Sequence, residues 1–399
     1  MKKIWIALLL IPALTAGAAE SWVSFVITAN DLPENGWVHI TGNHEKLGNW
    51  DPAAVALQKR ADGFWVLKVP VETGATLEYK FTLGSWDTEA LADDGSVPPN
   101  RVLRVGGDTT VREVVTQWRK PRNPAAPKYT GTVEYHAGME GEGILPRDVL
   151  VWLPPSYAAD AERRYPVLYM HDGQQVFNPA TSTHGVDWGV DETATRLIAE
   201  GRLREIIVVA ATCTSNRFPE YAETEQGGAF RRFLAKDLKA FIDSKYRTLA
   251  GREHTAVMGS SMGGRVSFLL AWEYPDVFSM AGCLSPSFSD ETLALARAKQ
   301  ESPPAVRFYM DNGGIGLEER LQKGIDRMLP LLQGMGFEQG NNLVWVLDPD
   351  AEHNEAAWAE RVWMPLLYFF GEGPQDWIAD LPPIPAPDDG PPPEVEAAP

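Results

Sequence analysis

Cysteine is scarce in this chain, which has only Cys213 and Cys283 among its 399 residues. Two cysteines so far apart do not form the framework of a disulfide-stabilised fold, and each follows a short apolar run, so we expect buried thiols. The seven histidines lack the spacing typical of metal ligands, and no glycine-rich loop that could hold a phosphate is present. The sequence therefore predicts neither a bound metal nor a cofactor.

Positive charge is also in short supply, because 36 Lys and Arg residues face 54 Asp and Glu residues, a formal net charge of -18. Polyanions repel such a protein, so nucleic acid is excluded as an expected partner. Part of the negative charge lies in residues 374–399, which are rich in proline and hold no Lys or Arg. This composition predicts a disordered, solvated tail.

Apolar runs long enough to cross a membrane are missing, so no membrane span is expected. At the start, Lys2 and Lys3 precede a shorter apolar run over 4–14, and small residues follow up to Ala19. This order is typical of a secretory signal peptide over 1–19 that is cleaved after Ala19. The sequence thus predicts a periplasmic or secreted protein.

Two hydrophobic patterns divide the rest of the chain. From 20 to 118, short β-rich runs alternate with turn signals, which predicts a small all-β sandwich. Residues 119–128, with three prolines, predict a linker. From 129 to 373, β-like runs alternate with helix-like runs, which predicts an α/β domain whose mostly parallel sheet is covered on both faces. Its expected strands are 148–153, 167–170, 206–210, 255–258, 306–311 and 343–347.

The segment Gly259-Ser260-Ser261-Met262-Gly263 lies between an apolar run and a helix-like stretch. A strand, a tight turn with serine at its tip and a helix together predict a nucleophile elbow at Ser261. Glycines beside the serine suit this turn, because side chains there would collide with the crossing strand and helix.

A serine nucleophile needs a base and a third group that orients the base. His353 is the only histidine after Ser261, and it follows the last expected strand, where this fold places the base. Asp311 ends an expected strand, and Glu318 and Glu319 follow where a helix would begin. Spacing alone does not choose the acid among them.

The oxyanion of the reaction needs two N–H donors. We expect one donor from the backbone of Met262, directly after the nucleophile. The other is expected from Gln174 or its neighbour, in the loop after the strand 167–170. His171 precedes this loop and is expected to pack beside the site rather than to act as a second base.

These motifs resemble the "putative esterase" family of α/β-hydrolases, which includes feruloyl esterases, enterochelin esterases, esterase D and the mycolyltransferases. The resemblance covers 129–373 and implies ester hydrolysis by Ser261 and His353 through an acyl-enzyme. In many members the acid stands three residues after the glycine that is Gly313 here, but this chain has Gly316 at that position. We therefore favour Glu318 as the acid and keep Asp311 as the alternative. The matching segments are 151–157, 166–174, 259–264, 311–313 and 353–358.

The first domain resembles a starch-binding carbohydrate module over 42–52, 78–81 and 99–101. In that family two exposed tryptophans, a lysine and an asparagine form a sugar site, and Trp50, Lys80 and Asn100 fall on matching positions. The second tryptophan is expected just before Asn100, where 96–99 read Ser-Val-Pro-Pro; Trp86 lies earlier. Both a working glycan site and a structural sandwich with Trp50 in its core remain open.

Three functions follow from these features. The leading hypothesis is an exported serine carboxylic ester hydrolase that acts on carbohydrate-linked esters, acetyl or feruloyl, with a polysaccharide as its partner. The second is a siderophore esterase that opens a cyclic catecholate ester. The third is a non-catalytic glycan-binding protein with an inert hydrolase domain. The sequence gives no indication of the oligomeric state.

Overall fold

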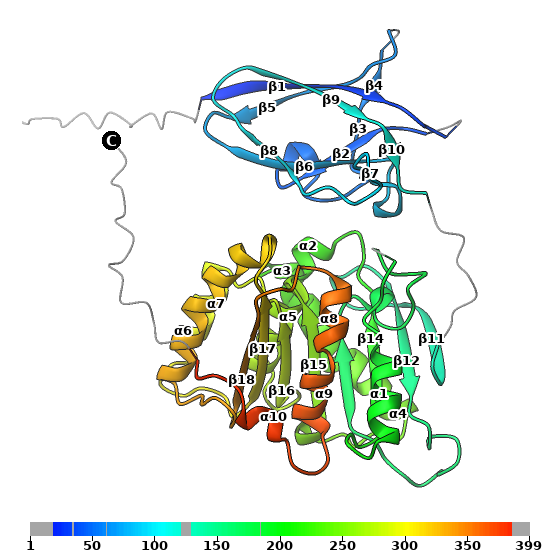
Figure 1. The fold of residues 1–399 in the computed structure, drawn as a ribbon, viewed down its shortest axis with the longest axis vertical. Coiled ribbons are helices and arrows are strands. Elements are labelled where there is room, and N and C mark those ends of the chain that lie inside the picture. Colours follow the sequence, from blue (N-terminus) through cyan, green and yellow to red (C-terminus); the bar gives the residue numbers. More distant parts are fainter. Residues whose placement is uncertain (1–18, 34–35, 61, 121–128, 184, 385–399) are drawn as a thin grey trace, which may run out of the picture. The chain divides into compact units, whose positions relative to one another are not determined.

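The computed structural model describes residues 19–33, 36–60, 62–120, 129–183 and 185–384, and it divides the chain into two compact units, Met1–Pro121 and Arg122–Pro399 (Figure 1). All but the last residue of the expected signal peptide, and residues 121–128 of the expected linker, lie outside the described residues. Arg119 was expected in the linker but belongs to the first unit. Its N–H donates to the Glu89 carbonyl at 2.9 Å, and its guanidinium pairs with the Glu89 carboxylate at 2.7 Å.

The first unit consists of two four-stranded sheets around one core, as a sandwich requires. In β1, the inward residues Val23, Phe25 and Ile27 alternate with more exposed ones. One sheet has the order β4 (Gln58–Lys59), β5 (Trp65–Glu72), β1 (Glu20–Ala29), β9 (Thr109–Val115). The other has the order β3 (Val55–Ala56), β2 (His39–Gly42), β6 (Thr76–Thr82), β8 (Arg101–Arg104). The short strands β7 (Ala90–Leu91) and β10 (Gln117–Trp118) pair with each other, and the 3₁₀ turns are η1 (Glu45–Leu47) and η2 (Trp86–Thr88).

The second unit is built on an eight-stranded sheet in the described residues. Its order is β11 (Thr132–Met139), β12 (Arg147–Leu153), β14 (Ile207–Ala211), β13 (Val167–Met170), β15 (Thr255–Ser260), β16 (Met280–Leu284), β17 (Arg307–Gly313), β18 (Leu343–Asp348). The pairs from β14 to β18 are parallel, and β11 and β12 are antiparallel at one edge. The carboxyl ends of β15 to β18 therefore meet at one edge of the sheet.

Helices cover both faces of this sheet, as its continuous apolar strands require. In β15, Val257 packs in one core, and Ala256 and Met258 pack in the core on the opposite face. Figure 1 shows α1 (Val190–Ala199), α8 (Glu355–Arg361) and α9 (Trp363–Phe370) on one face. The core of the other face includes residues of α3 (Glu225–Arg232), the π-helical turn η4 (Phe233–Leu238), α4 (Lys239–Lys245), α5 (Met262–Glu273), α6 (Asp290–Arg297) and α7 (Leu317–Gly334). The remaining short elements are α2 (Arg217–Glu220), η3 (Gly173–Gln175), η5 (Arg252–His254) and α10 (Asp376–Ala379).

Each of the six strands expected in this unit is present within one or two residues, and two further strands were missed. β11 lies at the sheet edge, and because most of its side chains are partly or fully exposed it offers no apolar run. β16 reads Met-Ala-Gly-Cys-Leu, which has little of the β-branched and aromatic content typical of strands. Cys283 lies in β16 and Cys213 follows β14, and both are free thiols.

The second unit extends beyond Gly373, which corrects the tail boundary expected at 374. Residues 376–379 form α10, and Trp377, Ile378 and Leu381 pack against the core that contains α1 and α9. Ile384 is buried in the core of the opposite face. The abundant prolines and acids around these few apolar residues account for the wrong boundary.

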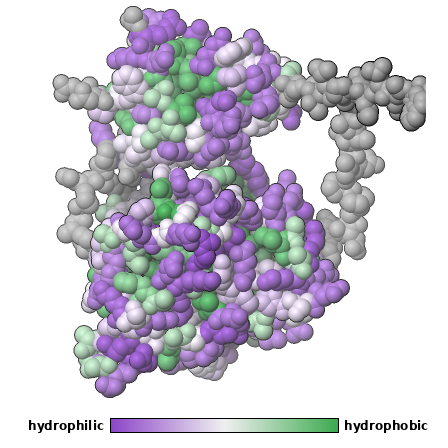
Figure 2. Space-filling view, turned by 180° about the vertical axis from the view of Figure 1, so that it is seen from behind, coloured by the Kyte–Doolittle hydropathy of each residue, from purple (hydrophilic) through white to green (hydrophobic). Residues whose placement is uncertain are grey.

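A protein with this many charged residues is expected to have a mostly hydrophilic surface. The face seen in Figure 2 is largely hydrophilic, with small hydrophobic patches between the polar residues. Among the described residues, no helix combines the length and the apolar character needed to cross a membrane.

The packing of Ile384 predicts a measurable contribution to stability. Ile384→Ala should lower the free energy of unfolding of the second unit by about 2 kcal/mol or more, because it leaves a cavity in a buried cluster. Leu295→Ala, at a side chain that is 39% exposed, is the control and should change it by about 0.5 kcal/mol or less. Calorimetric unfolding measures both, and equal effects would contradict the assigned packing.

Candidate active site and carbohydrate-binding site

Ser261 lies at the turn between β15 and α5, with backbone angles φ 57° and ψ -122°. A non-glycine residue in this region costs on the order of 1–3 kcal/mol, and such strain is typical of the nucleophile elbow. The Ser261 N–H donates to the Leu284 carbonyl at 2.9 Å, which holds the turn against the end of β16. The serine is thus presented at the carboxyl edge of the sheet.

The glycines around Ser261 allow α5 to cross the strand closely. A Cβ on Gly259 would lie 2.9 Å from both the Gly263 carbonyl carbon and the His171 ring. Burial lowers the pKa of His171 to about 4, so its ring is neutral at physiological pH. As expected, His171 packs beside the elbow, against the rings of Tyr221 and Phe230.

Close contact between two loops brings the candidate acid and base together. Gly314 and Ile315, after β17, both donate their N–H to the Ala351 carbonyl after β18, each at 3.1 Å. A Cβ on Gly313 would lie 2.4 Å from that carbonyl oxygen, so only glycine permits this approach. Glu318 follows in the first turn of α7, and His353 follows Ala351.

Glu318 is fully buried, and its Oε2 lies 3.3 Å from Nδ1 of His353. The distance is that of an ion pair, although the two groups are not aligned for a hydrogen bond. Catalytic contacts in unliganded hydrolases often tighten only when substrate is bound. The other carboxylate oxygen of Glu318 accepts a hydrogen bond from the Ser285 hydroxyl at 2.7 Å.

Asp311, the alternative acid, is engaged elsewhere. It is fully buried, and burial raises the pKa of its carboxyl while the Arg361 guanidinium opposes that rise. Its carboxylate accepts from four groups: Arg361 Nε at 3.1 Å, Arg361 Nη2 at 3.4 Å, the Ser285 N–H at 3.1 Å and the Tyr309 hydroxyl at 3.1 Å. The structure therefore places Glu318, not Asp311, beside His353.

At the position where the resembled family usually has its acid, this chain has Gly316, which carries no carboxylate. Its backbone has φ 68° and ψ -113°, a region that costs glycine less than other residues. Glu318 follows two residues later, so the carboxylate near His353 comes from the first turn of α7.

The loop expected to complete the oxyanion site follows β13. Asp172 has φ 55°, and its carboxylate pairs with Arg217 at 2.7 and 2.8 Å, which fixes the loop against α2. A Cβ on Gly173 would lie 2.5 Å from the Ala210 carbonyl, so the loop approaches β14 closely. In the described part of the chain, no acceptor takes the N–H of Gln174 or Met262, so both remain available to a substrate oxygen.

Sequence reasoning missed several residues that shape the site. Ser285 has a positive φ of 43°, a feature that its sequence context Leu-Ser-Pro does not reveal. Trp358 was noted only as part of a motif, yet its ring packs edge-on against His353 with centroids 4.9 Å apart. Arg217 begins α2, in a stretch of sequence (212–228) without a readable motif, where only its charge was a signal.

Two other features are not part of the acid–base pair. Asp187, Asp191 and Glu192 place carboxylate oxygens within 4.8 Å of one another at the start of α1. Burial raises the pKa of Asp187 to about 6 and that of Asp191 to about 8, and acids suit a first helical turn.

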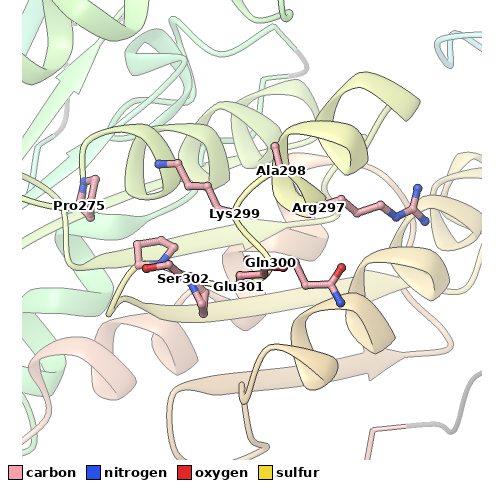
Figure 3. Close-up of a pocket in the computed structure, with 9 residues that line it drawn as sticks. Pro275, Arg297, Ala298, Lys299, Gln300, Glu301 and Ser302 are labelled. Atoms are coloured by element: carbon pink, nitrogen blue, oxygen red, sulfur yellow. The ribbon is translucent and has the colours of Figure 1, made fainter.

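The hollow in Figure 3 lies where β16 and β17 begin, at the sheet edge opposite Ser261. Residues around it include Pro275, Arg297, Lys299 and Glu301.

In the first unit, Trp50 is partly exposed and is not part of the core, which corrects the structural alternative. Its ring lies 6.5 Å from that of Trp86, at an angle of 34°. Trp86, in η2, is therefore the tryptophan beside Trp50, although its position in the sequence gave no clear match. Both rings are partly exposed.

Lys80 lies in β6, and Asn100 directly precedes β8. Lys80 pairs with Glu89 at 3.0 Å, and the Glu89 N–H donates to the Trp86 carbonyl at 3.4 Å. Asn100 donates to the Glu78 carboxylate at 3.0 Å. Glu78 is two residues before Lys80 on β6, so their side chains are on the same face of the sheet. The side chains of Lys80 and Asn100 are thus both engaged on one face of β6.

Comparison with known proteins decides the family. A profile described as "Putative esterase" matches residues 145–362, more than half of the chain. The chain belongs to this family. A second profile, described as "Starch binding domain", matches residues 21–114, within the first unit. The α/β-hydrolase fold, the esterase class and the N-terminal carbohydrate-binding module expected from the sequence are thereby confirmed.

The relatives cover parts of the chain. An endo-1,4-beta-xylanase/feruloyl esterase of Xylanibacter ruminicola is 27% identical over 205 residues, which is 47% of this chain and 25% of that protein. An alpha-amylase of Niallia circulans is 32% identical over 102 residues, 25% of this chain and 8% of the amylase. The chain therefore spans a quarter or less of the length of these two relatives. A ferulic acid esterase of Anaeromyces mucronatus, solved with ferulic acid, aligns with a TM-score of 0.45 at 19% identity, over 61% of this chain and 93% of that one.

Proposed function

We propose that this esterase acts through a Ser261–His353–Glu318 triad. The observation that carries the proposal is the buried Glu318 carboxylate 3.3 Å from His353 Nδ1, at the sheet edge where the strained Ser261 turn lies. In the proposed triad, Glu318 holds the ring at Nδ1 and leaves Nε2 for the nucleophile. This arrangement is the one that serine hydrolases need in order to activate a hydroxyl.

The reaction follows from these roles. The Ser261 hydroxyl attacks the ester carbonyl while His353 takes its proton, and the buried Glu318 charge stabilises the imidazolium that forms. The N–H groups of Met262 and Gln174 donate to the oxyanion. His353 returns the proton to the leaving alcohol, and water then hydrolyses the acyl-enzyme on Ser261 by the same sequence of steps.

Substitution of the two carboxylates tests which is the acid. Ser261→Ala and His353→Ala should lower kcat on a small aryl ester by about 10³-fold or more. Glu318→Gln should lower kcat by about 10²-fold or more, because the amide no longer stabilises the imidazolium. Asp311→Asn keeps the Glu318 charge and disturbs only its support, so it should lower kcat less than Glu318→Gln does. If kcat in the folded Asp311→Asn variant falls further than in Glu318→Gln, the assignment of the acid is wrong.

The finer proposal is that the substrate is a carbohydrate-linked acyl ester, acetyl or feruloyl. The starch-binding profile over 21–114 and the Trp50–Trp86 pair support a glycan partner. The Xylanibacter ruminicola relative is described as an endo-1,4-beta-xylanase/feruloyl esterase. A carbohydrate module joined to an esterase raises the local concentration of ester groups on a polysaccharide.

Retention on insoluble starch tests the glycan site. Trp50→Ala and Trp86→Ala should each weaken retention about tenfold, because each removes a ring face on which a sugar can stack. Trp22→Ala is the control, because Trp22 is exposed on β1 and contacts Lys68 instead. Equal retention of all three variants and the parent would contradict a site at this pair.

Rates on different esters separate the substrate classes in the same assay. Faster turnover of acetylated or feruloylated oligosaccharides supports the proposal, whereas faster opening of a cyclic catecholate ester supports the siderophore alternative. Retention on starch without turnover of any ester would support the non-catalytic alternative. The buried Glu318–His353 pair favours catalysis over that last outcome.

We also propose that the protein is exported, on the basis of the charged, apolar and small residues that follow one another over 1–19. Full-length chain produced in bacterial cells should appear in the periplasm or medium with Glu20 as its first residue, as read by mass spectrometry. Replacement of Leu8 and Leu9 by Arg should retain the protein in the cytoplasm, because it interrupts the apolar run. Cytoplasmic protein that keeps residues 1–19 in both cases would contradict export.

A further inference from the structure

A chain of two hydrogen bonds leads from Trp358 to the candidate acid. The Trp358 indole Nε1–H donates to the Ser285 hydroxyl at 3.0 Å, and that hydroxyl donates to Oε1 of Glu318 at 2.7 Å. An indole nitrogen only donates, so the Ser285 oxygen must act as acceptor towards Trp358. The single hydroxyl proton is therefore left for Glu318, and the direction of both bonds is fixed.

We propose that Ser285 and Trp358 are positioning residues that hold the Glu318 carboxylate in the orientation facing His353. The inference rests on the proposed function, in which Glu318 is the acid of the triad. With Oε1 held by Ser285, the other oxygen, Oε2, is turned towards Nδ1 of His353. The hydrogen bond also stabilises the charged carboxylate, which is fully buried and needs donors.

The backbone around Ser285 is fixed as firmly as its side chain. Ser285 is fully buried at φ 43°, and its N–H donates to both the carbonyl and a carboxylate oxygen of Asp311, at 3.0 and 3.1 Å. Asp311 is itself clamped by Arg361. The alternative acid of the sequence thus has a role of its own, which is to fix the residue that orients Glu318.

Trp358 contacts the base directly and supports the acid through Ser285. It supports Glu318 through Ser285, and its ring packs edge-on against the His353 ring at 4.9 Å and 85°. On its other side it packs against Trp188, with centroids 5.6 Å apart. A side chain held in this way limits rotation of the base and of the acid at the same time.

The test compares kcat and KM for an aryl ester. Ser285→Ala should lower kcat by about 10- to 100-fold with little change in KM, because the lost bond is one to a charged group. Ser285→Gly should give the same loss without backbone strain, since glycine suits φ 43°. Trp358→Phe keeps the ring but not the N–H and should give a smaller loss in kcat.

Two matched controls separate positioning from loss of packing. Ser279→Ala removes a buried hydroxyl that bonds the Arg252 carbonyl at the opposite end of β16. Trp363→Phe changes a tryptophan that packs on Trp377, outside the site. Both should leave kcat within about twofold of the parent, since neither contacts the triad. If Ser279→Ala lowers kcat as much as Ser285→Ala, positioning by Ser285 is excluded.

A double-mutant cycle with Glu318→Gln gives the decisive readout. If Ser285 acts through the Glu318 charge, adding Ser285→Ala to Glu318→Gln should lower kcat by no more than about threefold. A full additional 10- to 100-fold loss would overturn the proposal while leaving Glu318 as the acid. If Glu318→Gln alone leaves kcat unchanged, the proposed triad fails instead, so the two failures are distinguishable.

Discussion

Close backbone contact between the loops after β17 and β18 is the constraint on which the catalytic geometry depends. The Ala351 carbonyl takes two N–H groups from the neighbouring loop, and a Cβ on Gly314 would lie 2.2 Å from the Pro349 carbonyl. Because Gly313 and Gly314 place no side chain in this contact, the two loops approach closely and the first turn of α7 reaches His353. A buried carboxylate and an imidazole that come from separate loops are thereby held within 3.3 Å.

The order of the nucleophile and the base along the chain was predictable from the sequence, and the identity of the acid was not. Ser261 and His353 follow from a local turn motif and from their order, because the carboxyl ends of parallel strands share one edge. The acid depends on long-range contacts: Arg361, far along the chain, engages Asp311, whereas Glu318 lies beside His353. Hydrophobic patterns do not report such contacts. The positive φ of Ser285 was hidden for the same reason.

The fold shows the same division between local and distant information. Buried parallel strands were found because each is a continuous apolar run, whereas the edge strand β11 and the small-residue strand β16 carry no such run. Trp86 lies in a 3₁₀ turn that brings it beside Trp50. The spacing of the two residues in the sequence does not reveal the path of this turn. Ile384 was assigned to a solvated tail because composition averaged over 374–399 conceals a few apolar residues that pack.

The short helix α8 links the two buried carboxylates of the site. Trp358 and Arg361 are three residues apart and lie on one face of this helix. Trp358 reaches Glu318 through Ser285, and Arg361 contacts Asp311 directly. As a consequence, the last part of the domain is not an interchangeable module. A chimera with a relative that joins the two chains between α7 and α8 would combine both carboxylates from one parent with Trp358 and Arg361 from the other. Exchange is compatible with this geometry only if the segment from β16 to α8 is inherited as a block.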